Sequence, residues 1–101
     1  MQSIEILVIG TNEPILQTIA RLINQKEEWQ AKLAYSTSEA LNMCLSDSIK
    51  LVLIGAGIED RDANNFKLEI AQLRPQLPII EHYGGGSGLL FAEIYQGLAI
   101  K

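Results

Sequence analysis

The stretch that decides the fold is LVLIGAG at residues 51–57. Its first four residues are apolar, which is typical of a parallel strand that helices cover on both faces. The strand is followed by Gly55-Ala56-Gly57. Open α/β sheets gather ligands and catalytic groups beyond the carboxyl ends of their strands. A strand that ends in glycine and alanine therefore brings no reactive side chain to that place.

Strand and helix patterns alternate along the rest of the chain. Apolar runs predict strands, and apolar residues at helical spacing predict a helix after each of them. Such alternation requires right-handed crossovers, and hence a parallel sheet with helices on both faces. The predicted strands cover residues 4–9, 31–35, 51–54 and 78–80, and the predicted helices cover about 13–25, 38–46, 63–73 and 89–96.

Residues near the predicted helix ends support these boundaries. Ser36 and Glu39 form a capping box, in which the Ser36 hydroxyl accepts a first-turn N–H and Glu39 reaches back. The aspartates Asp60 and Asp62 are expected to cap the third helix. Gly97 is expected to stop the last helix, which leaves room for a short fifth strand at residues 98–100.

The composition describes one domain, residues 1–101, without a disulfide framework. The chain has 101 residues, 48% of them hydrophobic, near the lower size limit for a single core. Cys44 is the only cysteine and lies in the apolar phase of a predicted helix, so we expect a buried thiol and a reducing cytoplasm. The net charge of −4 disfavours a nucleic acid partner. The amino terminus lacks the pattern of a signal peptide or membrane span, so no membrane partner is expected.

Three fragments of the chain carry a family resemblance. They are ILVI at residues 6–9 ahead of Glu13-Pro14, KLVLI at residues 50–54, and LPII at residues 77–80. Together with the spacing of strands and helices, they resemble the receiver domain of two-component response regulators. The resemblance implies a flavodoxin-like, three-layer α/β/α fold with sheet order 2-1-3-4 and the possibility of the short fifth strand. It also implies that the fifth helix of a receiver is missing here.

A receiver that accepts a phosphoryl group needs an aspartate nucleophile, a carboxylate pair for Mg²⁺, a hydroxyl and a lysine. The resemblance places the acidic pair on Thr11 and Asn12, which are neutral, whereas Mg²⁺ prefers anionic oxygens; either residue is also able to cap the first helix. The acceptor position falls on Gly55, which has no nucleophile. The hydroxyl falls on Tyr83, and Lys101 is a weak match for the lysine. We therefore expect a pseudo-receiver: a non-catalytic signalling and protein-interaction module with no cofactor.

An alternative function rests on the run Gly84-Gly85-Gly86-Ser87-Gly88. Glycines before a helix let backbone N–H groups converge on an anion, so the chain could be a sensor of phosphate or a nucleotide. The run lacks the lysine of a Walker loop and matches no phosphate-binding fingerprint. The competing interpretation is a flexible hinge before the last helix, which we prefer.

Several single residues whose side chains are able to take part in chemistry are better explained by structural roles. His82 follows Glu81, but alternation along a strand sends the two to opposite faces of the sheet. A lone histidine forms no metal site, so we expect a structural or interface role for His82. The acidic residues near Gly57 lack the spacing of a calcium loop. Trp29 is expected to cover the end of the core.

The last helix indicates an interaction surface. Because the resemblance implies that the fifth helix is missing, we expect the first helix to cover one sheet face alone. Apolar strand residues on that face would then stay exposed, at a cost of about 1.5 to 3 kcal/mol each. The last helix is apolar on more than one side, which suits contact with a second chain. We therefore expect a homodimer, or docking of another signalling protein, through the fourth strand and through Phe91, Ile94 and Tyr95.

Overall fold

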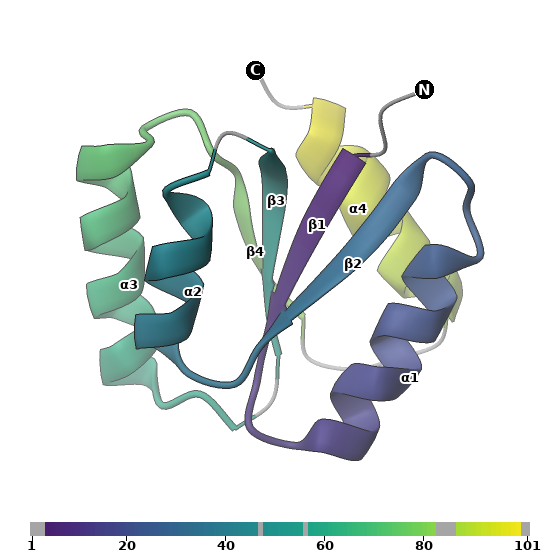
Figure 1. Ribbon diagram of the computed structural model, residues 1–101, viewed down its shortest axis with the longest axis horizontal. Coiled ribbons are helices and arrows are strands. Elements are labelled where there is room, and N and C mark those ends of the chain that lie inside the picture. The colour runs from purple at the N-terminus through teal and green to yellow at the C-terminus, as the bar shows by residue number, and fades with distance from the viewer. Residues whose placement is uncertain (1–3, 47, 56, 83–86, 100–101) are drawn as a thin grey trace.

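The structure is a computed structural model that describes residues 4–46, 48–55, 57–82 and 87–99 (Figure 1). Within these ranges, strands and helices alternate as predicted. β2 and β3 each begin two residues earlier than predicted, because Trp29 and Ile49 are buried and pair with β1. The elements are β1 (Ile4–Ile9), α1 (Glu13–Asn24), β2 (Trp29–Ala34), α2 (Thr37–Cys44), β3 (Ile49–Ile54), α3 (Asp60–Leu73), β4 (Ile79–Glu81) and α4 (Ser87–Ala99).

The four strands form one parallel sheet in the order β2-β1-β3-β4, which confirms the predicted order. β1 and β3 lie at its centre, with Ile9 beside Ile54 at their carboxyl ends. Neither strand alternates between apolar and polar residues, because helices cover both faces. Residues 6–9 and 51–53 have no exposed surface at all.

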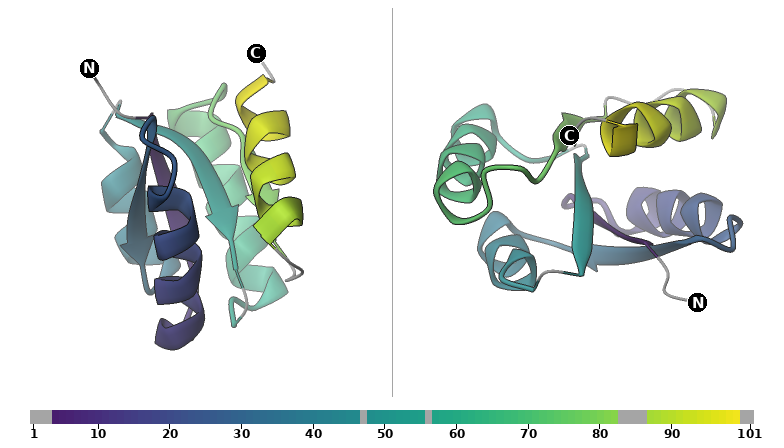
Figure 2. Two further views of the ribbon diagram at one scale, coloured as in Figure 1. Left: turned by 90° about the vertical axis from the view of Figure 1, so that its right-hand side faces the viewer. Right: turned by 90° about the horizontal axis from the view of Figure 1, so that it is seen from above.

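Two helices cover each face of the sheet, α2 and α3 on one side and α1 and α4 on the other (Figure 2). Alternate strand residues divide between the two layers. Leu7 and Val52 pack with the core beneath α2 and α3. Val8 and Leu53 pack with the core beneath α1 and α4. The three-layer α/β/α architecture is therefore confirmed.

Caps were predicted at the starts of α1, α2 and α3, and side-chain hydrogen bonds form at the first two of these helix starts. The Glu39 N–H donates to Ser36 Oγ at 3.1 Å, and the Tyr35 N–H donates to Glu39 Oε1 at 2.7 Å, so the capping box forms with its return bond to Tyr35, one residue before the cap. The prediction for α3 is wrong, because its N-cap is Glu59 and makes no side-chain cap bond. Asp60 and Asp62 lie inside the first turn, where their charge favours the positive end of the helix dipole.

The prediction of a short fifth strand is wrong for the residues that the structure describes, because Leu98 and Ala99 are the last residues of α4. Gly97 does not stop this helix. It is buried against the sheet, where a Cβ would lie 2.6 Å from Ile80 Cδ1 and 2.7 Å from Leu51 Cδ1. Only a residue without a side chain lets the helix come this close. The packing gained outweighs the cost of a glycine inside a helix, about 1 kcal/mol.

The prediction that α1 covers its face alone is also wrong. α4, yellow in Figure 1, lies on the same side of the sheet as α1, where the resemblance places the fifth helix of a receiver. Leu90 and Ile94 of α4 are buried beside residues of β1 and β3. The sheet face that was expected to be open is thus closed by the chain itself. No helix in the described ranges is long and apolar enough to cross a membrane.

Candidate functional site

The carboxyl ends of β1, β3 and β4 lie side by side, and their pairing continues one residue past the strands. The Gly55 N–H donates to the Ile9 carbonyl at 2.7 Å, and the His82 N–H donates to the Ile54 carbonyl at 2.8 Å. This continued pairing holds the backbone at the position where α/β sheets place their functional groups. The candidate site therefore consists of the residues that directly follow these three strands.

Gly55 has little room for a side chain. A Cβ there would lie 3.1 Å from the Ile9 carbonyl oxygen and 3.8 Å from Leu16 Cδ2. The first contact is with backbone, which yields less readily than the end of a flexible side chain. The site thus has neither a nucleophile at this position nor open space around it.

Gly57 lies directly against Thr11. Its φ of +94° belongs to the left-handed region, which glycine adopts without the cost that other residues incur. A Cβ on Gly57 would lie 1.9 Å from Thr11 Oγ1. The loop after β3 therefore packs on the loop after β1, in the place where the resemblance puts a bound Mg²⁺.

Asn12 has a structural task. Its side-chain oxygen accepts a hydrogen bond from the Ile15 N–H at 3.1 Å, which makes it the N-cap of α1. Of the two residues proposed as caps, Asn12 is thus the one used. An amide oxygen engaged in this way is a poor substitute for the carboxylate that Mg²⁺ prefers.

Several predicted site residues lie outside the described residues, namely Tyr83, Gly84, Gly85, Gly86 and Lys101. Gly88 of the same glycine-rich run is described: it is exposed, and a Cβ there would meet nothing within 4 Å.

His82 has a partner that sequence reasoning missed. Its Nδ1 is hydrogen-bonded to Glu93 Oε1 of α4, and the histidine side chain is 7% exposed. Glu81 pairs instead with Lys67 of α3 on the opposite layer, so Glu81 and His82 do face opposite sides of the sheet. The sequence contained one indication of this partner: Glu93 is the only charged residue between positions 87 and 99, in an otherwise uncharged helix.

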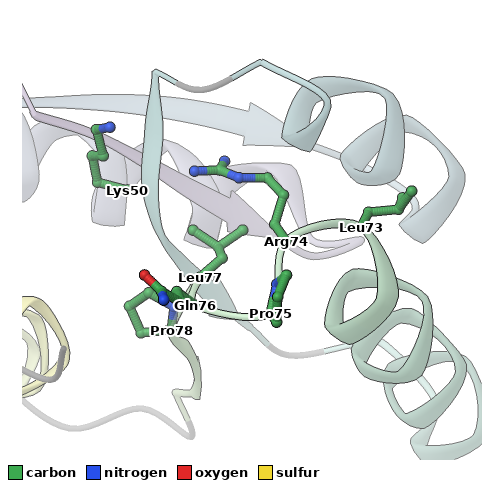
Figure 3. A pocket seen from close by; sticks show the side chains of 7 residues that line it. All are labelled: Lys50, Leu73, Arg74, Pro75, Gln76, Leu77 and Pro78. Atoms are coloured by element: carbon green, nitrogen blue, oxygen red, sulfur yellow. The ribbon is translucent and has the colours of Figure 1, made fainter.

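A shallow pocket lies at the opposite, amino-terminal edge of the sheet, beside the loop from α3 to β4 (Figure 3). Its volume is about 450 Å³. Its charged lining residues are Lys50 and Arg74, and the Arg74 guanidinium already donates to the carbonyls of Ser46 at 3.0 Å and Ile49 at 2.8 Å. These bonds join the end of α2 to the start of β3, so Arg74 has a structural role. The lining residues are Lys50, Leu73, Arg74, Pro75, Gln76, Leu77 and Pro78.

The described part of the chain offers neither a metal-binding cluster nor a reactive thiol. No cluster of three or more His, Cys, Asp or Glu side chains there is able to hold a metal ion. The Cys44 thiol is buried, and burial raises its pKa, an effect that the nearby Arg74 charge partly offsets. A thiol in this state is a poor nucleophile.

The three residues proposed for an interface differ in their surroundings. Ile94 has no exposed surface and belongs to the core of its own chain. Phe91 is half-buried, with its ring centroid 5.9 Å from that of Trp29. The Tyr95 ring is tilted against that of Trp29 with the ring centroids 4.9 Å apart, and Tyr95 is still 53% exposed. Trp29 itself is buried under this aromatic pair, as expected for a residue that covers the core.

Solved structures that resemble this chain include receiver domains. The signal receiver domain of an HD domain-containing protein from Pseudomonas fluorescens Pf-5 has 24% sequence identity and a TM-score of 0.69, over 99% of this chain and 78% of that chain. A two-component response regulator from Clostridium difficile has 18% identity and a TM-score of 0.78, over 96% of both chains. A response regulator receiver domain protein from Methanospirillum hungatei JF-1 has 17% identity and a TM-score of 0.70, over 98% of this chain and 78% of that chain.

The sequence matches no protein-family model and no curated protein. The structural similarity therefore establishes the fold, which is that of a response-regulator receiver domain with the sheet order β2-β1-β3-β4.

Proposed function

We propose that this chain is a non-catalytic signalling module that keeps the receiver fold and does not accept a phosphoryl group on aspartate. The observation that carries the proposal is the structure around Gly55. The position that the resemblance gives to the acceptor has no side chain, and the Ile9 carbonyl oxygen is 3.1 Å from where a Cβ would begin.

The neighbouring loops support the same proposal. A receiver activates its acceptor with Mg²⁺, which needs hard anionic oxygens around it. Here Asn12 is engaged as a helix cap, and Thr11, whose side chain is neutral, lies against Gly57. We therefore expect a signal to reach this module by contact with another protein, because the phosphoryl route has neither an acceptor at Gly55 nor carboxylate ligands for the metal. We place the module in the cytoplasm, where a free thiol such as Cys44 stays reduced.

The proposal is tested by incubation with acetyl phosphate and Mg²⁺, followed by intact-mass spectrometry. We expect no change in mass, while a receiver domain with its acidic residues in place gains a phosphoryl group in a parallel reaction. The Gly55→Asp variant is the matched control. It is expected to stay unmodified as well, because the metal ligands are still absent. A phosphoryl group on an aspartate or glutamate of the wild-type protein would refute the proposal.

The anion-sensor function is separated from this one by a thermal-shift titration with phosphate and nucleotides. A ligand at 100 times its dissociation constant adds about 2.7 kcal/mol of stability. In a domain of this size that corresponds to a rise of at least about 10 °C in melting temperature. We expect no such rise, and a saturable one would favour the sensor.

A further inference from the structure

The outer face of α4 differs from the exposed faces of the other helices because it carries no charge. Exposed charged residues occur on α1 (Glu13, Arg21), α2 (Glu39) and α3 (Arg61, Glu69). α4 has a single charged residue, Glu93, whose side chain is 19% exposed and bonded to His82. Between positions 88 and 99, the part of α4 whose exposure the structure describes, the exposed residues are Gly88, Leu89, Ala92, Tyr95, Gln96 and Ala99.

These six residues form one continuous face. At 3.6 residues per turn they fall within an arc of about 120°, with Ala92 at the centre. Leu89 and Tyr95 are about half exposed although both are large and largely apolar. Such side chains gain stability from burial, so this face, hereafter the α4 face, is suited to contact with another surface.

The charges that flank the α4 face have opposite signs on its two sides. Phe91 and Glu93 lie about 100° to either side of Ala92. The Lys26 ammonium lies 5.2 Å from the centre of the Phe91 ring, so one flank is positive. The opposite flank carries the carboxylate of Glu93. The two residues that mark these flanks on α4, Phe91 and Glu93, are the neighbours of Ala92 in sequence.

The charge distribution selects a second copy of this chain as the occupant. Two copies that each carry a net charge of −4 repel each other wherever acidic surfaces meet. The α4 face avoids that repulsion. In addition, a twofold axis parallel to α4 brings the positive flank of each copy beside the negative flank of the other, because such an axis exchanges the two sides of the face.

We propose that the protein forms a symmetric homodimer in which the α4 faces of two copies pack in parallel. This inference names the partner of the interaction module proposed above and rests on that function for its purpose. Ala92 meets its own copy at the axis, Leu89 lies over Gly88 of the second copy, and Lys26 approaches Glu93 of the second copy. An antiparallel pair would instead place like charges together on both flanks.

The interface differs from the one expected from sequence. Ile94 is absent from it, since it has no exposed surface. Phe91 contributes indirectly, because the Lys26 ammonium lies over its ring. One helix face is small beside a standard interface of about 800 Å² per partner, so we expect a dimer in rapid exchange with monomer.

The first test is sedimentation equilibrium over a range of concentrations. We expect concentration-dependent dimerisation. Leu89→Lys should weaken it at least tenfold, whereas Gln17→Lys, the same charge change on the exposed face of α1, should leave it unchanged. Lys26→Gln should weaken it several-fold and reduce its dependence on salt. A protein that stays monomeric at about 1 mM, or a Leu89→Lys variant that dimerises normally, overturns the proposal.

The parallel register has a test of its own. Mixing Leu89→Lys with Gly88→Glu places a lysine opposite a glutamate in the parallel heterodimer, while the other contact, Gly88 against Leu89, stays native. We expect the mixture to associate at least tenfold more tightly than either variant alone. Neither change touches the folded core, because both positions are exposed and Gly88 has open space around it. Absence of this rescue overturns the parallel register.

Two other occupants of the α4 face are distinguished by the same variants. Binding of the wild-type protein to phosphatidylcholine vesicles, lost in Leu89→Lys and without self-association, would assign the face to lipid and overturn the dimer. A wild-type monomer would do the same in favour of a different protein. The acetyl phosphate experiment is independent of all these results, so the failure of the dimer and the failure of the proposed function are separable.

Discussion

Replacing Gly97 by alanine tests whether α4 is seated on the sheet as described. The new Cβ would lie 2.6 Å from Ile80 Cδ1 and 2.7 Å from Leu51 Cδ1, whereas carbon atoms in contact prefer about 3.5 to 4.0 Å. The helix or the two side chains must move by about 1 Å. Ile80 is half-buried and has some freedom, but Leu51 is fully buried. Overpacking of this kind costs about 1 to 3 kcal/mol.

The matched control is Gly88→Ala in the same helix. A Cβ at Gly88 meets nothing within 4 Å, so this variant receives the helix preference of alanine without overpacking, a gain of about 0.4 to 1 kcal/mol. The same preference acts at Gly97, where it offsets part of the loss. The two variants should therefore differ by about 1 to 3 kcal/mol in unfolding free energy, with Gly97→Ala the less stable.

Trp29 provides the assay. It is the only tryptophan, and it contacts both Phe91 and Tyr95 of α4, so its fluorescence in urea reports on the docking of this helix as well as on unfolding. Measurements at micromolar protein concentration keep association out of the result. Adding Ile80→Val removes the Cδ1 atom that is overlapped, and the double variant should be more stable than the sum of the single effects predicts. If Gly97→Ala is as stable as Gly88→Ala, the close approach of α4 to the sheet is wrong.

Three other predictions concern the loop after β3, the pair between His82 and Glu93, and the buried Cys44 thiol. Gly57→Ala should lose at least about 1 kcal/mol in urea denaturation, because the left-handed backbone penalises a side chain. In the double variant Gly57→Ala, Thr11→Ala, only the part of the lost stability that comes from contact with the Thr11 side chain should be recovered. An unchanged urea midpoint for Gly57→Ala would refute the argument from the positive φ. His82→Phe should lose about 1 to 3 kcal/mol, because it leaves the Glu93 carboxylate half-buried without its partner. His82→Phe with Glu93→Met should recover most of that loss, whereas additive losses would argue against the pair. Because burial raises the pKa of the Cys44 thiol, the unfolded chain releases that proton at lower pH than the folded one, so stability should fall as pH rises above about 8.5. Cys44→Ala should show a smaller fall, and rapid alkylation of native Cys44 by iodoacetamide at neutral pH would contradict its burial.

Much of the scaffold was predictable because its signals are local. The continuous apolar runs in β1 and β3 indicated strands covered on both faces, and residues 6–9 and 51–53 of these strands form the fully buried centre of the sheet. The capping box at Ser36 and Glu39 depends on residues three apart, so it forms as read from sequence. Alternation along β4 correctly sent Glu81 and His82 to opposite layers. The lack of a side chain at Gly55, the position that the resemblance gives to the acceptor, is likewise a property of the sequence.

The position of α4 was decided by tertiary structure alone. A helix that is apolar on several sides fits either face of a sheet, and nothing local distinguishes a glycine that ends a helix from one that lets it pack closely. Gly97 is of the second kind because Leu51 and Ile80, distant in sequence, occupy the space beside it. The same long-range packing joins Glu93 to His82 and buries Ile94 in its own core. The charge-free face of α4 thus became visible only once the sheet had determined which side of the helix it covers.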